Sequence, residues 1–242
     1  MEIICLESAD STNSWLAQHE DELQSTSFVY CKTQTAGRGQ RGNSWESEPG
    51  KNITASIIFH PEKFPAIKQF MISETIALTI VDFLNDLGVK ARVKWPNDIY
   101  VGNGKICGIL VEHVVTGCLI SRTIAGFGIN INQTIFQSDA PNPVSLSMLT
   151  GLEYDIEKLI HNLTLKLEKN LQGLDEEQLH ERFLELLWRK DGFYHKFFDR
   201  KNNEPIEALI DSVERTGILN LKTRQGERRE YSFKEVEFII DE

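Results

Sequence analysis

The chain has 242 residues, with 26 Lys and Arg against 36 Asp and Glu, so its formal net charge is −10. With 40% hydrophobic and 26% charged residues, the composition is typical of a globular protein long enough to bury a large core. The acidity argues against sequence-independent nucleic-acid binding, which needs a basic surface. Because no apolar run reaches the roughly 18 residues of a membrane helix, we expect a cytoplasmic protein that binds neither nucleic acid nor membrane.

The start of the chain and the cysteines indicate the same compartment. Residues 1–7 have no basic segment and no long apolar stretch, so we expect no signal peptide. The four cysteines are widely spaced and include no CxxC pair, which is typical of reduced thiols. The six histidines form no HxxxH or HxH pattern, so the sequence predicts no fixed metal site.

The first half of the chain predicts short strands and two helices. Residues 65–87 give the clearest helix, because apolar residues recur with the 3.6-residue period and Gly88 follows as a helix-terminating residue. A cluster of Ser, Thr and Asn predicts the start of the earlier helix. The predicted elements are strands over residues 2–7, 28–31 and 52–59, helices over residues 12–23 and 65–87, and a loop over residues 35–51.

The second half predicts a β-meander, two helices and a separate group of short strands. The meander turns at Asn103-Gly104 and Thr116-Gly117. After His195, short strands broken by glycine turns indicate a small β-barrel. We therefore predict an α+β protein, with a mixed β-sheet and packed helices in residues 1–194 and a barrel in residues 195–242. Its elements are strands over residues 89–94, 99–101, 105–115 and 119–131, and helices over residues 154–171 and 176–190.

A loop rich in glycine and arginine, Gly37–Gly42, matches the GxGxxG pattern of dinucleotide-binding proteins. That pattern must open a helix whose N-terminus faces pyrophosphate. The residues that follow have no helical apolar period, so we reject a dinucleotide site. The glycines allow a ligand to approach the backbone, and Arg38 and Arg41 carry fixed positive charge. The loop therefore predicts an anion-binding site, with a flexible solvated loop as the alternative.

Polar residues interrupt the apolar strands at two further places. The segment Lys94–Asp98 reads Lys-Trp-Pro-Asn-Asp, and a hairpin would bring Lys105 back beside Asn97 and Asp98. Taken alone, Lys105 has a less favoured alternative as a lysine on the rim of a surface hairpin, and the nearby Gly/Arg loop weakens that alternative further. The glycines in Gly126–Asn130 mark either close approach of a ligand or a β-bulge.

Four motifs, in order over residues 2–132, resemble those of biotin–protein ligases; they are Asp10–Asn13, Gln34–Trp45, Lys94–Glu112 and Gly126–Asn130. The resemblance implies a catalytic domain similar to class II aminoacyl-tRNA synthetases, followed by an SH3-like barrel. It also implies a biotin–[acetyl-CoA-carboxylase] ligase, which makes biotinyl-5′-AMP and pyrophosphate from biotin and Mg-ATP. The biotin then passes to a lysine of a biotin carboxyl carrier domain. Such chemistry needs cations where the carboxylate meets the α-phosphate.

The same resemblance implies roles for individual residues. Lys105 would bridge the biotin carboxylate and the α-phosphate, with Arg38 and Asp98 as the other catalytic residues. No metal is fixed by the protein, and Mg²⁺ carried with ATP would lie near Asp98. The implied biotin-binding residues are Ser11, Thr12, Asn13, Gln34, Gly37, Arg38, Gly39, Gln40, Lys105, Gly108, Gly126 and Gly128, and the implied nucleotide-binding residues are Arg41, Trp45, Asn97, Asp98 and Asn130.

The sequence departs from the family pattern at Gln40 and Asn43, where the family loop often has arginine. Gln40 removes a charge close to the adenylate, which bears on how tightly that intermediate is retained. Because the catalytic motifs begin at the start of this chain, the resemblance implies no N-terminal DNA-binding domain and no repressor role.

Three other interpretations stay open. A lipoate– or octanoate–protein ligase also attaches an acyl group to a carrier lysine. A non-catalytic biotin-binding effector module should lack the cationic residues. An adenylating enzyme with a small-molecule acceptor would share the first step. A homodimer formed edge to edge through the sheet is open as well.

Overall fold

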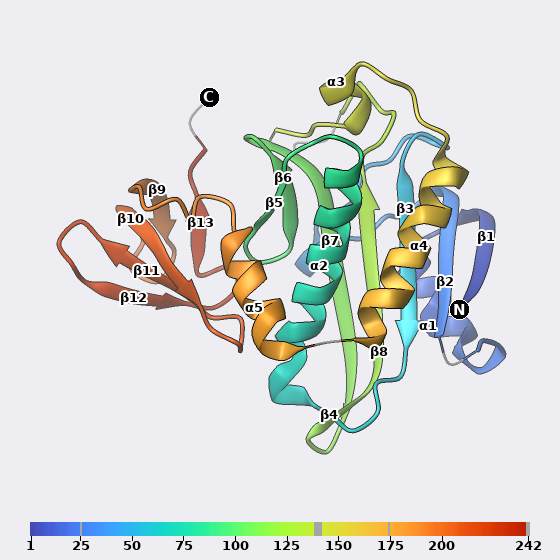
Figure 1. The fold of residues 1–242 in the computed structure, drawn as a ribbon, viewed down its shortest axis with the longest axis horizontal. Helices are drawn as coiled ribbons and strands as arrows, with labels where there is room; N and C mark the ends of the chain where they lie inside the picture. The colour runs from blue at the N-terminus through green and yellow to red at the C-terminus, as the bar shows by residue number, and fades with distance from the viewer. Residues whose placement is uncertain (25, 138–141, 174, 241–242) are drawn as a thin grey trace.

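The computed structural model describes residues 1–24, 26–137, 142–173 and 175–240, and at Arg41 it describes the backbone alone. Its centre is a mixed eight-stranded sheet in the order β1-β2-β3-β8-β7-β6-β5, with β4 paired to β8 (Figure 1). β1 and β2 run parallel to each other, and the other strand pairs of the described sheet are antiparallel. The strands are β1 (Glu2–Ala9), β2 (Thr26–Gln34), β3 (Ile53–Phe59), β4 (Phe64–Pro65), β5 (Ala91–Lys94), β6 (Asp98–Val101), β7 (Gly104–Thr116) and β8 (Leu119–Ile129).

Helices cover both faces of this sheet. In β3, Ile57 belongs to the main core and Ile58 to a second, smaller core with Leu16 of α1, because successive side chains of a strand point to opposite faces. The predicted long helix is confirmed over Gln69–Asp86, and Gly88 follows it with a φ of +87°. Its predicted start at residue 65 is wrong, because Phe64–Pro65 pairs with β8 and a 3₁₀ turn precedes the helix. The helices are α1 (Thr12–His19), α2 (Gln69–Asp86), α3 (Leu146–Thr150), α4 (Ile156–Gln172) and α5 (Glu176–Glu185), with short 3₁₀ turns η1 (Glu20–Glu22), η2 (Gln40–Gly42) and η3 (Ala66–Lys68).

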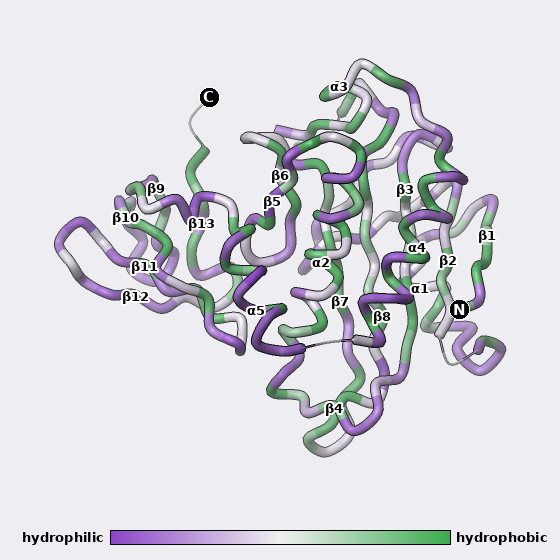
Figure 2. Tube along the Cα trace, viewed as in Figure 1, coloured by the Kyte–Doolittle hydropathy of each residue, from purple (hydrophilic) through white to green (hydrophobic). Residues whose placement is uncertain are grey.

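The last two long helices show the amphipathic pattern expected of them. Figure 2 shows hydrophilic residues along the outer side of α4 and α5. Asp155 caps α4 by accepting a hydrogen bond from the Lys158 amide, and Asp175 caps α5 in the same way. These caps and faces explain why both helices were predictable from sequence.

The predicted extent of α5 is wrong at its C-terminal end. The helix ends at Glu185, not near residue 190, because the following residues pair with the edge of the sheet. The Val93 amide donates to the Leu186 carbonyl at 2.9 Å, and the Trp188 amide donates to the Val93 carbonyl at 2.7 Å. A tertiary contact thus overrides helix propensity.

The C-terminal strands form a second, antiparallel sheet in the order β12-β11-β10-β9-β13. The predicted separate β-structure is confirmed, and it begins at His195. The sheet is consistent with the predicted SH3-like domain, and among the described residues its outer strands, β12 and β13, are not paired with each other. Its strands are β9 (His195–Asp199), β10 (Glu204–Val213), β11 (Leu219–Thr223), β12 (Arg228–Tyr231) and β13 (Val236–Phe238).

The two sheets are joined by an aromatic contact. Trp95, 1% exposed, donates from Nε1 to the carbonyl of Gly217 at 2.9 Å. Phe233 packs edge-on against Trp95, with ring centroids 5.4 Å apart. Because these residues lie more than 120 positions apart, only the folded chain brings the segment Lys94–Asp98 under the C-terminal sheet.

A buried carboxylate stabilises the C-terminal sheet. Asp199 is fully buried and accepts hydrogen bonds from Tyr231 Oη at 2.7 Å and from Arg229 Nη1 at 2.9 Å. Burial alone would raise the pKa of the Asp199 carboxyl, but these bonds and those from Asn202 outweigh it and lower the pKa from 3.8 to about 2.

We therefore expect acid to destabilise the C-terminal sheet. A carboxyl whose pKa is lowered by folding stabilises the fold above its unfolded pKa, and this stabilisation is lost as the pH falls from about 4 to 2, by roughly 2 kcal/mol. Urea unfolding at pH 7, 4 and 2.5 measures it. Asp199→Asn should have a lower free energy of unfolding at pH 7 than the wild type, and that free energy should depend less on pH. Asp211→Asn, at a half-exposed position of the same sheet, should keep the wild-type pH profile. An unchanged profile for Asp199→Asn would contradict this account.

Within the described residues, no helix has the length and apolar content needed to cross a bilayer.

Candidate functional site

One large cavity, of about 1040 Å³, lies where the loop after β2, the β5–β6 turn and the C-terminal sheet come together. Its size is at the upper end of the range for small-molecule sites. It gathers most of the residues predicted from sequence, whose motifs are separated by up to 120 positions. Those that line it are Ser11, Thr12, Asn13, Gln34, Arg38, Gly39, Gln40, Trp45, Asn97, Asp98, Lys105, Gly108, Gly126, Gly128 and Asn130.

Two predicted residues are not among the lining residues. Gly37 is the first residue of the loop, and a Cβ added to it would stand 2.5 Å from the carbonyl oxygen of Trp45. The absence of a side chain at this position therefore lets the loop close on itself. The side chain of Arg41 lies outside the described residues.

The Gly/Arg loop is a tight hairpin and does not open a long helix. The Gly39 amide donates to the Asn43 carbonyl at 2.7 Å, and the Trp45 amide donates to the Gly37 carbonyl at 2.9 Å. Gly42 has a φ of +89°, which favours glycine. After the single turn η2, the next regular element is strand β3, so the sequence-based rejection of a dinucleotide fingerprint is confirmed.

One end of the cavity is a buried polar network. Gln34 Oε1 accepts a hydrogen bond from the Thr12 amide at 2.8 Å, and Thr12 Oγ1 lies 2.6 Å from Ser56 Oγ. Ser56 is fully buried and donates to Asn13 Oδ1 at 2.6 Å. Ser11 is the N-cap residue of α1 by position, but its side chain makes no capping hydrogen bond. Donors and acceptors arranged in this way suit a neutral polar ligand group.

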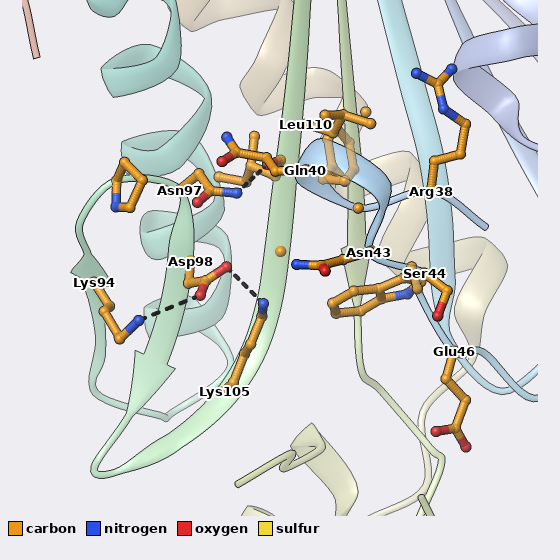
Figure 3. A pocket seen from close by; sticks show the side chains of 18 of the residues that line it. Arg38, Gln40, Asn43, Ser44, Glu46, Lys94, Asn97, Asp98, Lys105 and Leu110 are labelled. Carbon is orange, nitrogen blue, oxygen red and sulfur yellow. Dashed lines mark hydrogen bonds and ion pairs between the residues drawn. The ribbon is translucent and has the colours of Figure 1, made fainter. Parts of the chain in front are cut away.

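Arg38 faces a carboxylate of the protein. It forms an ion pair with Glu112 and donates to Ser14 Oγ at 3.3 Å. Glu112 also accepts a hydrogen bond from Asn13 Nδ2 at 2.7 Å. Figure 3 shows Arg38 on the opposite side of the cavity from Lys105. Arg38 and Lys105 therefore line one cavity but do not meet at one point.

The indole of Trp45 covers the glycine floor of the cavity. A Cβ added at Gly128 would lie 2.2 Å from Trp45 Nε1, and one added at Gly108 would lie 2.9 Å from the same ring system. Lys105 Nζ is 5.7 Å from the centre of the indole. Here the glycines provide room for an aromatic side chain, a contact that the sequence did not indicate.

Two buried polar atoms of the cavity lack a hydrogen-bond partner within the described part of the chain, Trp45 Nε1 and Asn130 Oδ1. Buried donors and acceptors are nearly always paired. Trp45 Nε1 is packed against Gly128, so a partner could reach it only if the loop that carries Trp45 moved.

The predicted hairpin between Asp98 and Lys105 is confirmed. Asp98 pairs with Gly108 and Tyr100 with Lys105 across β6 and β7. Lys105 Nζ lies 2.8 Å from Asp98 Oδ1. Asn97 extends this pairing, because its Nδ2 donates to the Ile109 carbonyl at 2.7 Å.

Sequence reasoning missed several residues of the cavity. Lys94, Arg200 and Lys234 add positive charge to its lining. Lys94 belongs to β5, whereas Arg200, Lys234, Glu237 and Phe238 belong to the C-terminal part of the chain. Ser56 lies behind the lining, in the polar network with Thr12 and Asn13, and it was detectable as one of two polar residues in the mainly apolar strand β3. The contribution of the C-terminal sheet had no signal in the sequence, because it depends on how the two sheets pack.

The described residues do not fit a resident Mg²⁺. They contain no group of three or more His, Cys, Asp or Glu side chains that could hold a metal ion. The two oxygens of Asp98 each face a lysine, at 2.8 Å and 3.7 Å. Mg²⁺ in proteins often keeps its water and is held mainly by substrate phosphates.

Fold and site together define an α+β protein with a polar, partly cationic ligand cavity. Residues 5–130, just over half of the chain, match the model of the biotin/lipoate A/B protein ligase family. The chain belongs to this family.

Individual relatives agree with the family assignment. The chain is 32% identical over 219 residues to the bifunctional ligase/repressor BirA of Salmonella typhimurium. The aligned residues cover 90% of this chain and 65% of that protein. It is 31% identical over 158 residues to the biotin–[acetyl-CoA-carboxylase] ligase of Paracoccus denitrificans, covering 62% and 65%. This chain thus spans less than two thirds of each relative.

The fold is also that of solved biotin protein ligases. The enzyme from Aquifex aeolicus, in complex with biotin and ATP, superposes with a TM-score of 0.79 at 22% identity and covers 99% of both chains. At this identity the similarity establishes the fold.

Proposed function

We propose that the chain is an ATP-dependent biotin–protein ligase. It forms biotinyl-5′-AMP from biotin and ATP with release of pyrophosphate, and it transfers biotin to a lysine of a biotin carboxyl carrier domain. The observation that carries the proposal is that one cavity holds both a buried polar network and a lysine–aspartate–lysine cluster. The relatives named as biotin–[acetyl-CoA-carboxylase] ligases support the choice of substrate.

The polar end of the cavity would hold the ureido group of biotin. Thr12 and Gln34 supply hydroxyl and amide groups, and Ser11 adds a hydroxyl from the start of α1. A site that hydrogen-bonds a polar group rejects analogues that lack it, because its own buried groups would be left unpaired. The dithiolane ring of lipoate and the methyl end of octanoate have no such group, so this end favours biotin.

The cationic end would promote adenylation. The biotin carboxylate attacks the α-phosphate, the new O–P bond forms and pyrophosphate leaves. Lys105 would offset the repulsion between these two anions, and it would stabilise the negative charge that develops in the transition state. Asp98 fixes the Lys105 ammonium by an ion pair of 2.8 Å. Mg²⁺ would arrive with ATP and neutralise phosphate charge.

Further residues of the cavity would contact the nucleotide and the substrate oxygens. Trp45 and Asn130, which line the cavity, would lie on the nucleotide side, as the family resemblance implies, and Arg38 would exchange Glu112 for substrate oxygens. In the second step the carrier lysine, as a free amine, attacks the acyl carbon, and AMP leaves with the electrons of the broken C–O bond. The role of Arg41 as a triphosphate ligand stays a prediction.

The wider assignments are also proposals. We divide the chain into domains over residues 1–194 and 195–242, since the second sheet begins at His195. The cysteines of the chain are free, which supports a cytoplasmic protein, and the charge of −10 supports the absence of a nucleic-acid partner. A homodimer stays a prediction, which the molar mass from light scattering tests.

Biotin-dependent ATP–pyrophosphate exchange tests the proposed function, with lipoate and octanoate run in parallel. We expect exchange with biotin, followed by labelling of a carrier domain. Exchange with lipoate or octanoate alone would replace the assignment with the other branch of the family. Biotin binding without exchange would indicate an effector module, and exchange without carrier labelling would indicate a small-molecule acceptor.

A further inference from the structure

The lysine that opens the Lys-Trp-Pro-Asn-Asp segment lies at the junction of the two sheets. Lys94 ends β5, and its side chain is only 15% exposed. Its ammonium lies 5.0 Å from the ring centre of Phe238 in β13 and 5.2 Å from that of Tyr100 in β6. It is thus held between one aromatic ring of each sheet, at distances typical of cation–π contacts.

The aromatic rings around Lys94 form a continuous cluster. Trp188 packs on Tyr100 with centroids 5.0 Å apart and on Phe238 at 5.9 Å, and Phe197 packs on Phe238 at 4.9 Å. Trp188 Nε1 donates to the Gly102 carbonyl at 2.7 Å. Because this cluster contains residues of both sheets, the position of the Lys94 ammonium depends on how the sheets pack.

Lys94 shares its carboxylate with the lysine of the reaction. Asp98 Oδ2 lies 3.7 Å from Lys94 Nζ, and Asp98 Oδ1 lies 2.8 Å from Lys105 Nζ. Figure 3 shows the two ammonium groups approaching Asp98 from different strands. With both lysines protonated, the cluster has a net charge of +1; burial lowers the pKa of the Lys94 ammonium, and the Asp98 carboxylate opposes this shift.

This charge balance decides how strongly Lys105 can act on a substrate. With Lys94 present, the charge of Asp98 is divided between two ammonium groups, so part of the Lys105 charge stays available to an incoming anion. Without Lys94, Asp98 and Lys105 form a neutral pair, and the carboxylate is free to rotate away from its present orientation. Both effects weaken a preorganised electrostatic site.

We propose that Lys94 is a positioning residue for adenylation. Its contact with the Phe238 ring fixes the Lys94 ammonium, and this ammonium in turn keeps Asp98 beside Lys105. Lys94 thereby couples the C-terminal sheet to the reacting centre. The proposal rests on the proposed function and assigns a role to a residue outside the sets predicted from sequence. It gives the C-terminal sheet a part in the first chemical step through Phe238.

The test measures biotin-dependent pyrophosphate exchange and biotin affinity in the full chain. Lys94→Met keeps the length and apolar stem of the side chain but removes the charge. We expect exchange to fall roughly 10- to 100-fold, the range seen when a reacting group is misplaced. The biotin dissociation constant, measured by calorimetry, should change by less than about threefold, because the polar network that would bind the ureido group does not include Lys94.

A double-mutant cycle with Phe238→Leu tests the coupling. Phe238→Leu should lower exchange several-fold, and Lys94→Met/Phe238→Leu should be no worse than Lys94→Met, because both changes act through one contact. Lys201→Met is the matched control, since Lys201 Nζ lies 5.7 Å from the Tyr231 ring in the same sheet but does not line the cavity. This control should keep the wild-type rate.

The outcomes separate this proposal from the proposed function. A wild-type chain without biotin-dependent exchange would refute the function. If the wild-type chain is active, any of three results would overturn the positioning role. These are an exchange rate of Lys94→Met within threefold of the wild-type rate, an equal loss of exchange rate and biotin affinity in this variant, and additive effects of the two substitutions. If Lys94→Met does not fold, as judged by circular dichroism, Phe238→Leu alone decides, and unchanged exchange in it would overturn the proposal.

Discussion

Lys105→Ala is expected to lower biotin-dependent pyrophosphate exchange by roughly 100- to 1,000-fold, the effect of removing one group that stabilises transition-state charge. Lys105 begins the apolar part of β7, and its ammonium is fixed by Asp98 at 2.8 Å in the lining of the cavity. Since the carboxylate and the α-phosphate repel each other most strongly as they meet, the lost charge should cost more in the transition state than in the bound substrates.

Comparison of two constants checks this expectation. The maximal exchange rate should fall much more than the affinity for biotin, whereas an equal loss in both would show that Lys105 only binds substrate. Lys32→Ala is a suitable control, because Lys32 also forms an ion pair, with Glu7 at 2.7 Å, but lies on the surface. A control that lost activity to the same degree would point to a general effect of the lower charge.

Gly126→Ala is expected to weaken biotin binding by roughly 10- to 100-fold, which corresponds to an overpacking cost of about 1–3 kcal/mol. The added Cβ would lie 2.0 Å from Asn13 Oδ1 and 2.8 Å from its Cγ. Asn13 cannot move without breaking its hydrogen bonds to Ser56 and Glu112. The displacement would therefore spread to Thr12 and Gln34, at the end of the cavity assigned to the ureido group.

Calorimetric titration with biotin measures this effect, and thermal unfolding shows whether the fold is retained. Gly173→Ala is the matched control, because a Cβ at Gly173 meets no atom within 4 Å and its φ is −132°. It should bind biotin as the wild type does. Wild-type affinity in Gly126→Ala would show that Asn13 can rearrange freely and that the network does not shape the biotin site.

Local signals in the sequence carried much of the fold. The period of apolar residues with Gly88 marked α2. The β6–β7 hairpin was also marked, although it turns at Gly102-Asn103, one residue before the predicted Asn103-Gly104, because Val101 pairs with Gly104. Such features depend on neighbours within a few residues, so the sequence displays them directly. The end of α5 was not predictable, because the pairing of Val93 with residues 186–188 competes with the helix.

The candidate site shows the same division. Its motifs could be recognised because glycine, lysine and aspartate stand where apolar strand residues are expected, and most of them line one cavity. Their present partners could not be recognised. Arg38 pairs with Glu112 across 74 positions, and Trp45 packs on Gly128 across 83. The chain order gives no information on which side chains meet at such separations.

By itself, the sequence determined the class of fold, the family motifs and the hairpin that carries Asp98 and Lys105, since each follows from local periodicity, turn chemistry or residue type. Only the tertiary structure decided that the C-terminal sheet lines the cavity and that the Phe238 ring lies 5.0 Å from the Lys94 ammonium. These features arise from the packing of two sheets, where the contact between residues 94 and 238 depends on the burial of aromatic surface that no local pattern encodes.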